Sequence, residues 1–300
     1  MARGQRSSRR RDAMIPNPNV SRKPFPLPVV ALGPGTQNDD APEFPQFPKE
    51  MHTFTAPHGW MLRETGCSEA AVAWLERFFQ AIAQCPEGPV VAAVDELSEP
   101  QRRWIEDAFG VGEVVAQTAA PFSLRVRESA FPGIWHEVVL GADGAVVRDE
   151  WRYAPYSAKL VDAMSATSHD VCTPPQAPTG VMNGPALVEE LRHWAGKGTM
   201  GRAVTVLNLT LLPLTPADLQ MLNDWLGPPM VAIAIRSYGQ CRVASTRLRD
   251  VWRVQYFNSM DALILDTIEV TRLPEVVRAA PEDLALTRSR LADYLAELAR

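Results

Sequence analysis

The chain of 300 residues is 46% hydrophobic and carries a net charge of −5. This length can form one large domain or two domains of roughly 100 to 150 residues. No apolar run approaches the roughly 20 residues of a membrane-spanning helix, which argues against insertion into a bilayer. Four cysteines, Cys67, Cys85, Cys172 and Cys241, lie far apart without a C-x-x-C pair. Their spacing argues against a zinc or iron-sulfur ligand cluster and favours a reduced, cytoplasmic protein.

Residues 1–66 are predicted to form a basic, proline-rich extended arm. Ten of the 26 prolines fall within the first 60 residues, where their fixed φ angles and missing amide donors prevent regular structure. The first 24 residues hold seven basic residues and one acidic residue, a net charge of +6 that leaves −11 for the rest. A body this acidic argues against nucleic-acid binding, because each phosphate would add repulsion. The arm could contact an anionic surface, but a solvated tail is the favoured interpretation.

Regular structure is predicted to begin at residue 68. Apolar residues recur at helical spacing from Val72 to Ile82, and Pro86 then interrupts the pattern, as expected at the end of a helix. The following PVVAAV predicts a short buried strand.

The next stretch has a second copy later in the chain. LSEPQRRWIEDAFG begins at Leu97, and LTPADLQMLNDWLG begins at Leu214, 117 residues further on. Ser98 and Thr215 can each cap a helix that has proline in its first turn and glycine at its end. The chain therefore contains an internal repeat. Further pairs at this displacement are Asp107 and Asp224, Gly110 and Gly227, Arg125 and Arg242, Trp135 and Trp252, and Asp149 and Asp266.

Each copy is predicted to form a two-layer α+β module. Runs of short strands, at about 112–153 and 229–271, are joined by turn signals, which implies antiparallel pairing. Helices before and after each run would cover one face of its sheet. The predicted domains after the arm are a first module at 67–166, a linker at 167–184 and a second module at 185–300. The apolar stripe of the last helix is expected to dock on the second module.

The sequence offers no clear catalytic constellation. The five histidines show no H-x-x-x-H spacing, and no G-x-S-x-G motif is present, so the common zinc and serine-nucleophile patterns are missing. The repeated aspartates, such as Asp149 and Asp266, are expected to make local hydrogen bonds rather than to act in catalysis. Cys241, which an arginine follows, could be a reactive thiol or a metal ligand, but a small buried residue is the favoured interpretation. We therefore expect no enzyme activity, no metal site and no cofactor.

The second copy has gained residues that are typical of protein interfaces. Arginine, tyrosine and tryptophan bury large areas while offering directional polar contacts. The alternative is that Trp252 and Tyr256 pack beneath helices while Arg253 is merely solvated. The predicted partner-binding residues are Arg236, Tyr238, Arg242, Trp252, Arg253, Tyr256 and Asn258.

Several long segments also resemble a known family. They are VVALGPGTQ near the start, VTVLNLTLLPLTPADLQMLNDWLG, SYGQCRVASTRLRDVWRVQYFNSMDALILDTIEV and LPEVVRAAPEDL. These segments are similar to the HupH/HyaF/HoxQ family of NiFe hydrogenase expression and formation proteins. The resemblance runs from about residue 28 to 300 and is strongest from 201 to 285, whereas the basic stretch before residue 24 lies outside it.

The resemblance implies a cytoplasmic accessory protein in hydrogenase maturation. Such a protein would be a chaperone for the iron-sulfur small subunit precursor before export, with other maturation proteins as further candidate partners. The resemblance supplies no catalytic residues. The alternative is an iron-sulfur carrier or maturation enzyme that uses Cys241 with other ligands.

Overall fold

The computed structural model describes residues 68–85, 87–169, 176–195, 197, 203–236 and 239–298. All of these residues belong to one compact unit. The predicted arm at 1–66 lies outside the described residues, as does Tyr238. No helix within the described ranges combines the length and the apolar character that crossing a membrane requires.

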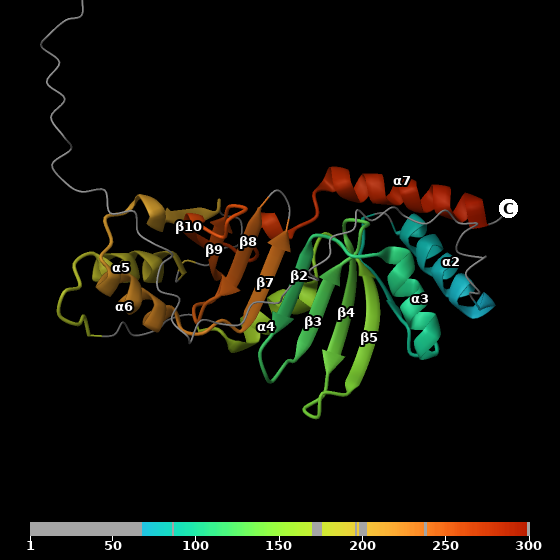
Figure 1. Cartoon of the computed structure of the whole chain (residues 1–300), viewed down its shortest axis with the longest axis horizontal. Helices are drawn as coiled ribbons and strands as arrows, with labels where there is room; N and C mark the ends of the chain where they lie inside the picture. The colour runs from blue at the N-terminus through green and yellow to red at the C-terminus, as the bar shows by residue number, and fades with distance from the viewer. Residues whose placement is uncertain are drawn as a thin grey trace, which may run out of the picture. The chain divides into compact units, whose positions relative to one another are not determined.

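Ten strands form a single antiparallel sheet with helices packed against it, which makes this an α+β fold (Figure 1). The order across the sheet is β1-β5-β4-β3-β2-β7-β8-β9-β10-β6. The first five strands in sequence are β1 (Val90–Ala93), β2 (Val114–Thr118), β3 (Leu124–Glu128), β4 (Ile134–Leu140) and β5 (Val146–Tyr153). The others are β6 (Thr205–Asn208), β7 (Val231–Arg236), β8 (Gln240–Ser245), β9 (Val251–Phe257) and β10 (Leu263–Val270).

The pairing of β2 with β7 joins the two halves, so the structure has one continuous sheet where two separate sheets were predicted. Ala116 lies opposite Ile233, its counterpart 117 residues later, at the centre of this pairing. Outward from this pair the order is β3, β4, β5, β1 on one side and β8, β9, β10, β6 on the other. The register and the strand order therefore have the same approximate two-fold symmetry. That the two halves are homologous modules remains a prediction.

The helices group at the two ends of the sheet and at its middle. Helices α2 (Glu69–Gln84) and α3 (Glu99–Phe109) lie beside the β1–β5 end, and α5 (Gly184–Ala195) and α6 (Pro216–Leu226) lie at the other end (Figure 1). Helix α4 (Ala158–Thr167) contacts β7 near the middle. The remaining elements are the short 3-10 helices η1 (Leu209–Leu211) and η2 (Glu275–Val277), and the long helix α7 (Pro281–Leu298).

Three apolar clusters form the core. The first packs α2, α3 and α7 against aromatic residues that include Trp151, and the third packs α5 and α6 against β9 and β10. The central cluster lies under α4 and holds both repeat-matched tryptophans, Trp135 and Trp252, which are fully buried. Apolar burial is therefore continuous across the junction of the two halves.

Helix α7 packs on the first half of the chain, so the prediction that it docks on the second module is wrong. Its residues Leu291 and Tyr294 belong to the first cluster, where the Tyr294 ring lies 5.8 Å from that of Phe131. Thr287 Oγ1 also donates to the carbonyl of Pro132 at 2.9 Å. The central cluster beside β7 is already covered by α4, whereas the aromatic cluster of the first half offers an apolar surface that matches the stripe of α7.

The predicted helix ends are confirmed in both copies. Ser98 and Thr215 each begin a capping box with the residue three positions later, and proline follows within the first turn. Gly110 and Gly227 end these helices with φ of 63° and 71°, in the region that favours glycine.

The carboxylate of Asp218 ties the start of α5 to the start of α6. Its Oδ1 accepts hydrogen bonds from the backbone amides of Met182, Asn183 and Gly184 at 2.8, 2.9 and 2.7 Å. Its Oδ2 accepts from the amide and the hydroxyl of Thr215, each at 2.8 Å. Burial by itself would raise the pKa of Asp218, but these hydrogen bonds outweigh it and hold the pKa well below the ordinary value.

Substitution of Asp218 should destabilise the second half strongly. Asp218→Ala leaves several amide donors without an acceptor, and we expect a loss of about 3 kcal/mol in the free energy of unfolding. Urea unfolding followed by circular dichroism measures this loss. Asp224→Ala on the exposed side of the same helix removes only a contact with Gln220, and serves as the control. Equal stability of the two variants would contradict the role of Asp218.

Near the start of α7, Glu128 is a buried carboxyl in an acidic surrounding. Burial, opposed by a hydrogen bond from the amide of Gly133 and aided by the carboxylates of Glu113 and Asp283, raises the pKa of Glu128 from 4.5 to about 7. Because folding disfavours the ionised form, the cost to stability is absent below pH 4.5 and complete above about pH 7.

Removal of this charge should stabilise the protein only at higher pH. Glu128→Gln keeps the acceptor for Gly133 and should raise the free energy of unfolding by about 2 kcal/mol at pH 8, with little change at pH 4. Denaturant unfolding at both pH values measures the difference, and Glu275→Gln at an exposed site is the control. A gain of the same size at both pH values would refute the titration of Glu128.

Candidate partner-binding surface

One face of the central strands carries five arginines. Cross-strand pairing places Arg127 opposite Val115, Val115 opposite Ala234, and Ala234 opposite Arg242, and directly opposed residues point to the same side of a sheet. Alternation along each strand brings the remaining arginines to this side. We call this surface the arginine face, and its arginines are Arg125, Arg127, Arg236, Arg242 and Arg253.

Small side chains form the floor between these arginines, and helices flank it. Ala232 and Ala234 of β7 lie between the two groups of arginines. Glu106 of α3 pairs with Arg127 at 2.6 Å, and Asn223 of α6 accepts from Arg253 at 2.5 Å. The guanidinium groups of Arg127 and Arg253 are therefore positioned by neighbouring helices, which lowers the entropy lost when a partner binds.

The Arg253 side chain is anchored by a bidentate ion pair. Its Nε lies 2.9 Å from Asp266 Oδ1, and its Nη2 lies 2.6 Å from Asp266 Oδ2. Gln255 Nε2 also donates to Asp266 Oδ2 at 3.3 Å. Asp266 lies on β10, a strand inside the sheet, and its partner Arg253 stands 13 residues earlier on β9. Its hydrogen bonds therefore run across strands, whereas local bonds were expected.

The first half has a matched pair that the sequence reasoning missed. His136 and Asp149 stand 117 residues before Arg253 and Asp266, and His136 Nε2 lies 2.7 Å from Asp149 Oδ1. Arg127 can only donate to Nδ1 of this histidine, at 3.0 Å, so in this arrangement Nε2 carries the hydrogen that Asp149 accepts. The ring also stacks on Trp151. The displacement of 117 residues aligns His136 with Arg253 and Asp149 with Asp266. Because His136 and Arg253 are both basic, this alignment would have revealed the His136–Asp149 pair.

The structure does not bring all of the predicted partner-binding residues together. Arg236, Arg242 and Arg253 share the arginine face, and the guanidinium of Arg242 lies 4.5 Å from the ring of Phe257. Asn258 belongs to the β9–β10 turn, where its Oδ1 accepts from the amides of Met260 and Ala262. Tyr238 lies outside the described residues.

Trp252 and Tyr256 project from the opposite face of β9. Trp252 is fully buried in the central cluster, so it supports the sheet from beneath and cannot itself touch a partner at the surface. Its Nε1 has no acceptor among the described residues, whereas Trp135 Nε1 donates to the carbonyl of Ala154 at 2.9 Å. Tyr256 is half-buried beside Cys241.

Burial largely suppresses the reactivity of Cys241. It raises the pKa of the Cys241 thiol to about 12, despite a hydrogen bond with Tyr256, so the thiol stays protonated at neutral pH. Burial also raises the pKa of Tyr256 to about 12 and raises that of Glu269. The described part of the chain holds no group of three or more histidine, cysteine, aspartate and glutamate side chains placed to bind a metal.

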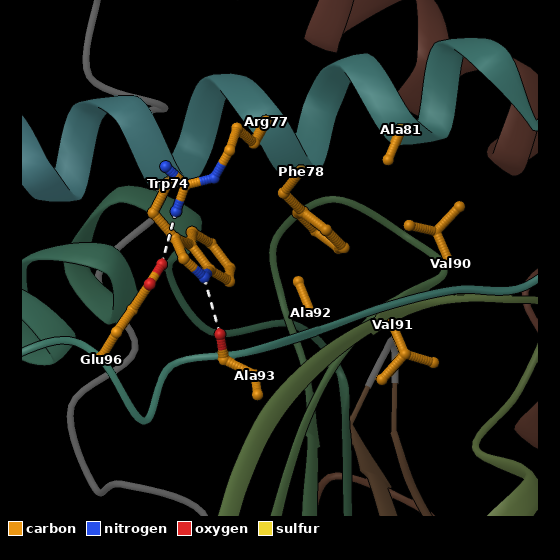
Figure 2. A pocket seen from close by; sticks show the side chains of 9 residues that line it. All are labelled: Trp74, Arg77, Phe78, Ala81, Val90, Val91, Ala92, Ala93 and Glu96. Carbon is orange, nitrogen blue, oxygen red and sulfur yellow. Dashed lines mark hydrogen bonds and ion pairs between the residues drawn. The ribbon is translucent and has the colours of Figure 1, made fainter.

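A hollow of about 210 Å³ lies between α2 and β1 at the far end of the sheet (Figure 2). Figure 2 shows its rim, where Arg77 reaches Glu96 and Trp74 Nε1 donates to the carbonyl of Ala93 at 2.8 Å. Pockets for small ligands usually measure about 300 to 1,000 Å³. The size of this hollow therefore makes it a weaker candidate for a functional site than the arginine face.

Comparison with known proteins gives a consistent set of relatives. Residues 181–298 match the family described as HupH hydrogenase expression protein, C-terminal conserved region. The chain is 34% identical over 274 residues to the hydrogenase expression/formation protein HoxQ of Cupriavidus necator, covering 90% of this chain and 97% of that protein. It is 37% identical to the hydrogenase expression/formation protein HupH of Rhodobacter capsulatus, with the same shares covered.

Two further similarities extend this set. The chain is 31% identical over 281 residues to the hydrogenase-1 operon protein HyaF of Escherichia coli, covering 89% of this chain and 96% of that protein. Among solved structures, it is similar to the hydrogenase expression protein HupH from Thiobacillus denitrificans, with 30% identity and a TM-score of 0.35. That match covers 39% of this chain and 97% of the solved one.

Proposed function

Because this chain belongs to the HupH/HoxQ/HyaF family of hydrogenase expression and formation proteins, we propose that it assists the maturation of a hydrogenase as a chaperone. The membership predicted from sequence motifs is confirmed by relatives at 31% to 37% identity. The proposed client is the iron-sulfur small subunit precursor, which the protein binds in the cytoplasm before export. Other maturation proteins are further candidate partners.

The observation that carries this proposal is the part of the arginine face that lies on the half that the family model matches. Arg236, Arg242 and Arg253 lie within residues 181–298, and each is half-buried. Arginine is enriched at protein interfaces because its planar group makes several directed hydrogen bonds over a large contact area. A surface of this kind suits the binding of a polypeptide.

We attribute the difference between the two halves to a duplication followed by specialisation. At positions 117 residues apart, the second half has Arg236 where the first has Ala119, and Arg253 where the first has His136. In this proposal the first half, at 67–166, is mainly a scaffold, and the second half, at 185–300, carries the docking surface. The symmetric register around Ala116 and Ile233 supports this interpretation.

The geometry favours binding rather than catalysis. Asp149 and Asp266 are both engaged in structural pairs, and the thiol of Cys241 is buried with a raised pKa. A general base or a nucleophile must be accessible and suitably ionised. These groups therefore serve the fold.

Charge reversal on the arginine face should weaken capture of the client. The tagged protein should co-purify with the hydrogenase small subunit precursor, and the double variant Arg236→Glu, Arg242→Glu should lower the affinity at least about tenfold. Isothermal titration with purified precursor measures the affinity. Arg103→Glu on the exposed surface of α3 is the matched control. The proposal fails if the unchanged protein captures no precursor, or if the double variant binds as tightly as the control.

Substitution of the buried cysteine separates this proposal from the iron-sulfur alternative. Cys241→Ser should leave capture of the precursor within about twofold of the unchanged protein, because a protonated, buried thiol makes no contact with a partner. Iron and sulfide are to be measured in the anaerobically purified complex as well. If this variant loses both the protein-bound iron and the capture of the precursor, the result would instead support the alternative of an iron-sulfur carrier that uses Cys241.

A further inference from the structure

The edge at β6, the last described strand on its side of the sheet, is unusually apolar for an edge strand. Strand β6 is the last strand of the sheet and pairs only with β10 among the described strands. Ala203–Leu214, which includes β6, contains no charged residue, and Val204 and Val206 are 51% and 52% exposed. Edge strands normally carry charges or prolines that block the addition of another strand. This edge lacks such charges along its length.

The apolar surface continues past the end of β6. Thr210 of η1 accepts from the amide of Asp266 through Oγ1, which places η1 alongside β10. Leu211 is 79% exposed, and Ile264 near the start of β10 is 57% exposed. We call this surface the apolar edge, and it consists of Val204, Val206, Leu211, Leu212, Leu263 and Ile264. Exposed apolar side chains that gather near one edge of a sheet favour an interaction site.

The opposite edge of the sheet differs in its surroundings. Val91 of β1 is also exposed, but the charged residues Asp95 and Glu96 follow the strand closely. Trp74 of α2 already uses the carbonyl of Ala93, and Arg77 of the same helix pairs with Glu96 (Figure 2). Contacts from α2 therefore occupy part of the edge at β1. This edge serves as a comparison for the edge at β6.

The charge of Glu269 indicates which kind of polypeptide segment would bind at the apolar edge. Glu269 of β10 lies directly opposite Val206, is half-buried, and forms no ion pair with any described basic residue. A second copy of the chain would bring a second Glu269 to this edge, and like charges repel. A segment with a basic side chain would neutralise it. Because a strand beyond Val206 lies two strand spacings from β10, only a long side chain such as arginine or lysine reaches that carboxylate.

We propose that β6 accepts an extended apolar segment of the client polypeptide as an added strand, with a basic side chain of that segment bound to Glu269. The outward amides and carbonyls of β6 supply the main-chain hydrogen bonds, and the apolar edge supplies the side-chain contacts. The inference rests on the proposed function, since the client is taken to be a hydrogenase precursor.

Defined peptides test the edge with the full-length protein. The probe is a fluorescein-labelled peptide of about ten alternating valines and threonines with a central arginine, compared with the same peptide carrying glutamate instead. Fluorescence anisotropy should show binding that is about tenfold tighter for the arginine peptide. Glu269→Gln should remove most of that difference, and Val206→Lys should abolish binding of both peptides.

Matched variants and hydrogen exchange identify the strand. Val91→Lys places the same charge on the opposite edge and should leave peptide binding unchanged. The arginine peptide should slow amide exchange at Thr205–Asn208, as an added strand would. The proposal is overturned if neither peptide binds, if binding survives Val206→Lys, or if Glu269→Gln leaves the preference for arginine intact. A dimer of the unchanged protein that Val206→Lys dissociates would also overturn it, because a second copy would then occupy the edge.

The experiments distinguish a failure of the strand-addition proposal for β6 from a failure of the proposed chaperone function. If the unchanged protein and Val206→Lys capture the small subunit precursor equally well, the edge proposal is wrong and the chaperone function stands. If the unchanged protein captures no precursor, the proposed function is wrong, and the peptide comparison alone decides whether β6 accepts a strand.

Discussion

The antiparallel pairing of β2 with β7 is the interaction on which the rest of the structure depends. Each of these strands would otherwise be the edge of a five-stranded half, with a row of unsatisfied amides and carbonyls. Their union buries both edges and merges the apolar side chains of the two halves into the cluster beneath α4. It also places Arg125 and Arg127 on the same surface as Arg242 and Arg253. The arginine face therefore exists only because the halves share one sheet.

The same junction is reinforced by helices that cross it. Helix α4 follows the strands of the first half but contacts β7 of the second, whereas α7 follows the strands of the second half but packs against α2. Each half thus contributes a helix to the core of the other. We therefore expect the two halves to unfold together, because each uses a helix of the other to cover its apolar core.

Local features of the fold could be predicted from the sequence because they depend on few residues. Capping by Ser98 and Thr215, and termination at Gly110 and Gly227, follow from neighbouring atoms alone. The displacement of 117 residues also identified positions with matched roles, such as the buried tryptophans Trp135 and Trp252. Capping residues and terminating glycines in the sequence therefore predict where helices begin and end.

Long-range features could not be predicted, because the sequence does not state which surfaces meet. The stripe of α7 indicates that the helix docks but not where, and alternation along β9 separates Trp252 from Arg253 without revealing which side is covered. The anchoring of Arg253 by Asp266 and Asn223 required the positions of β10 and α6. Residue type therefore suggested an interface, and only the assembled sheet separated the arginines from the buried tryptophan.

The position of α7 has a consequence for synthesis on the ribosome. The aromatic cluster of the first half includes Leu291 and Tyr294, which are translated long after the strands they cover. A nascent chain that has emerged with only its first half keeps part of that aromatic surface exposed to water until α7 has emerged and docked. We therefore expect the upstream half to be a substrate for general folding factors during translation, even though the finished molecule is itself proposed to protect another polypeptide.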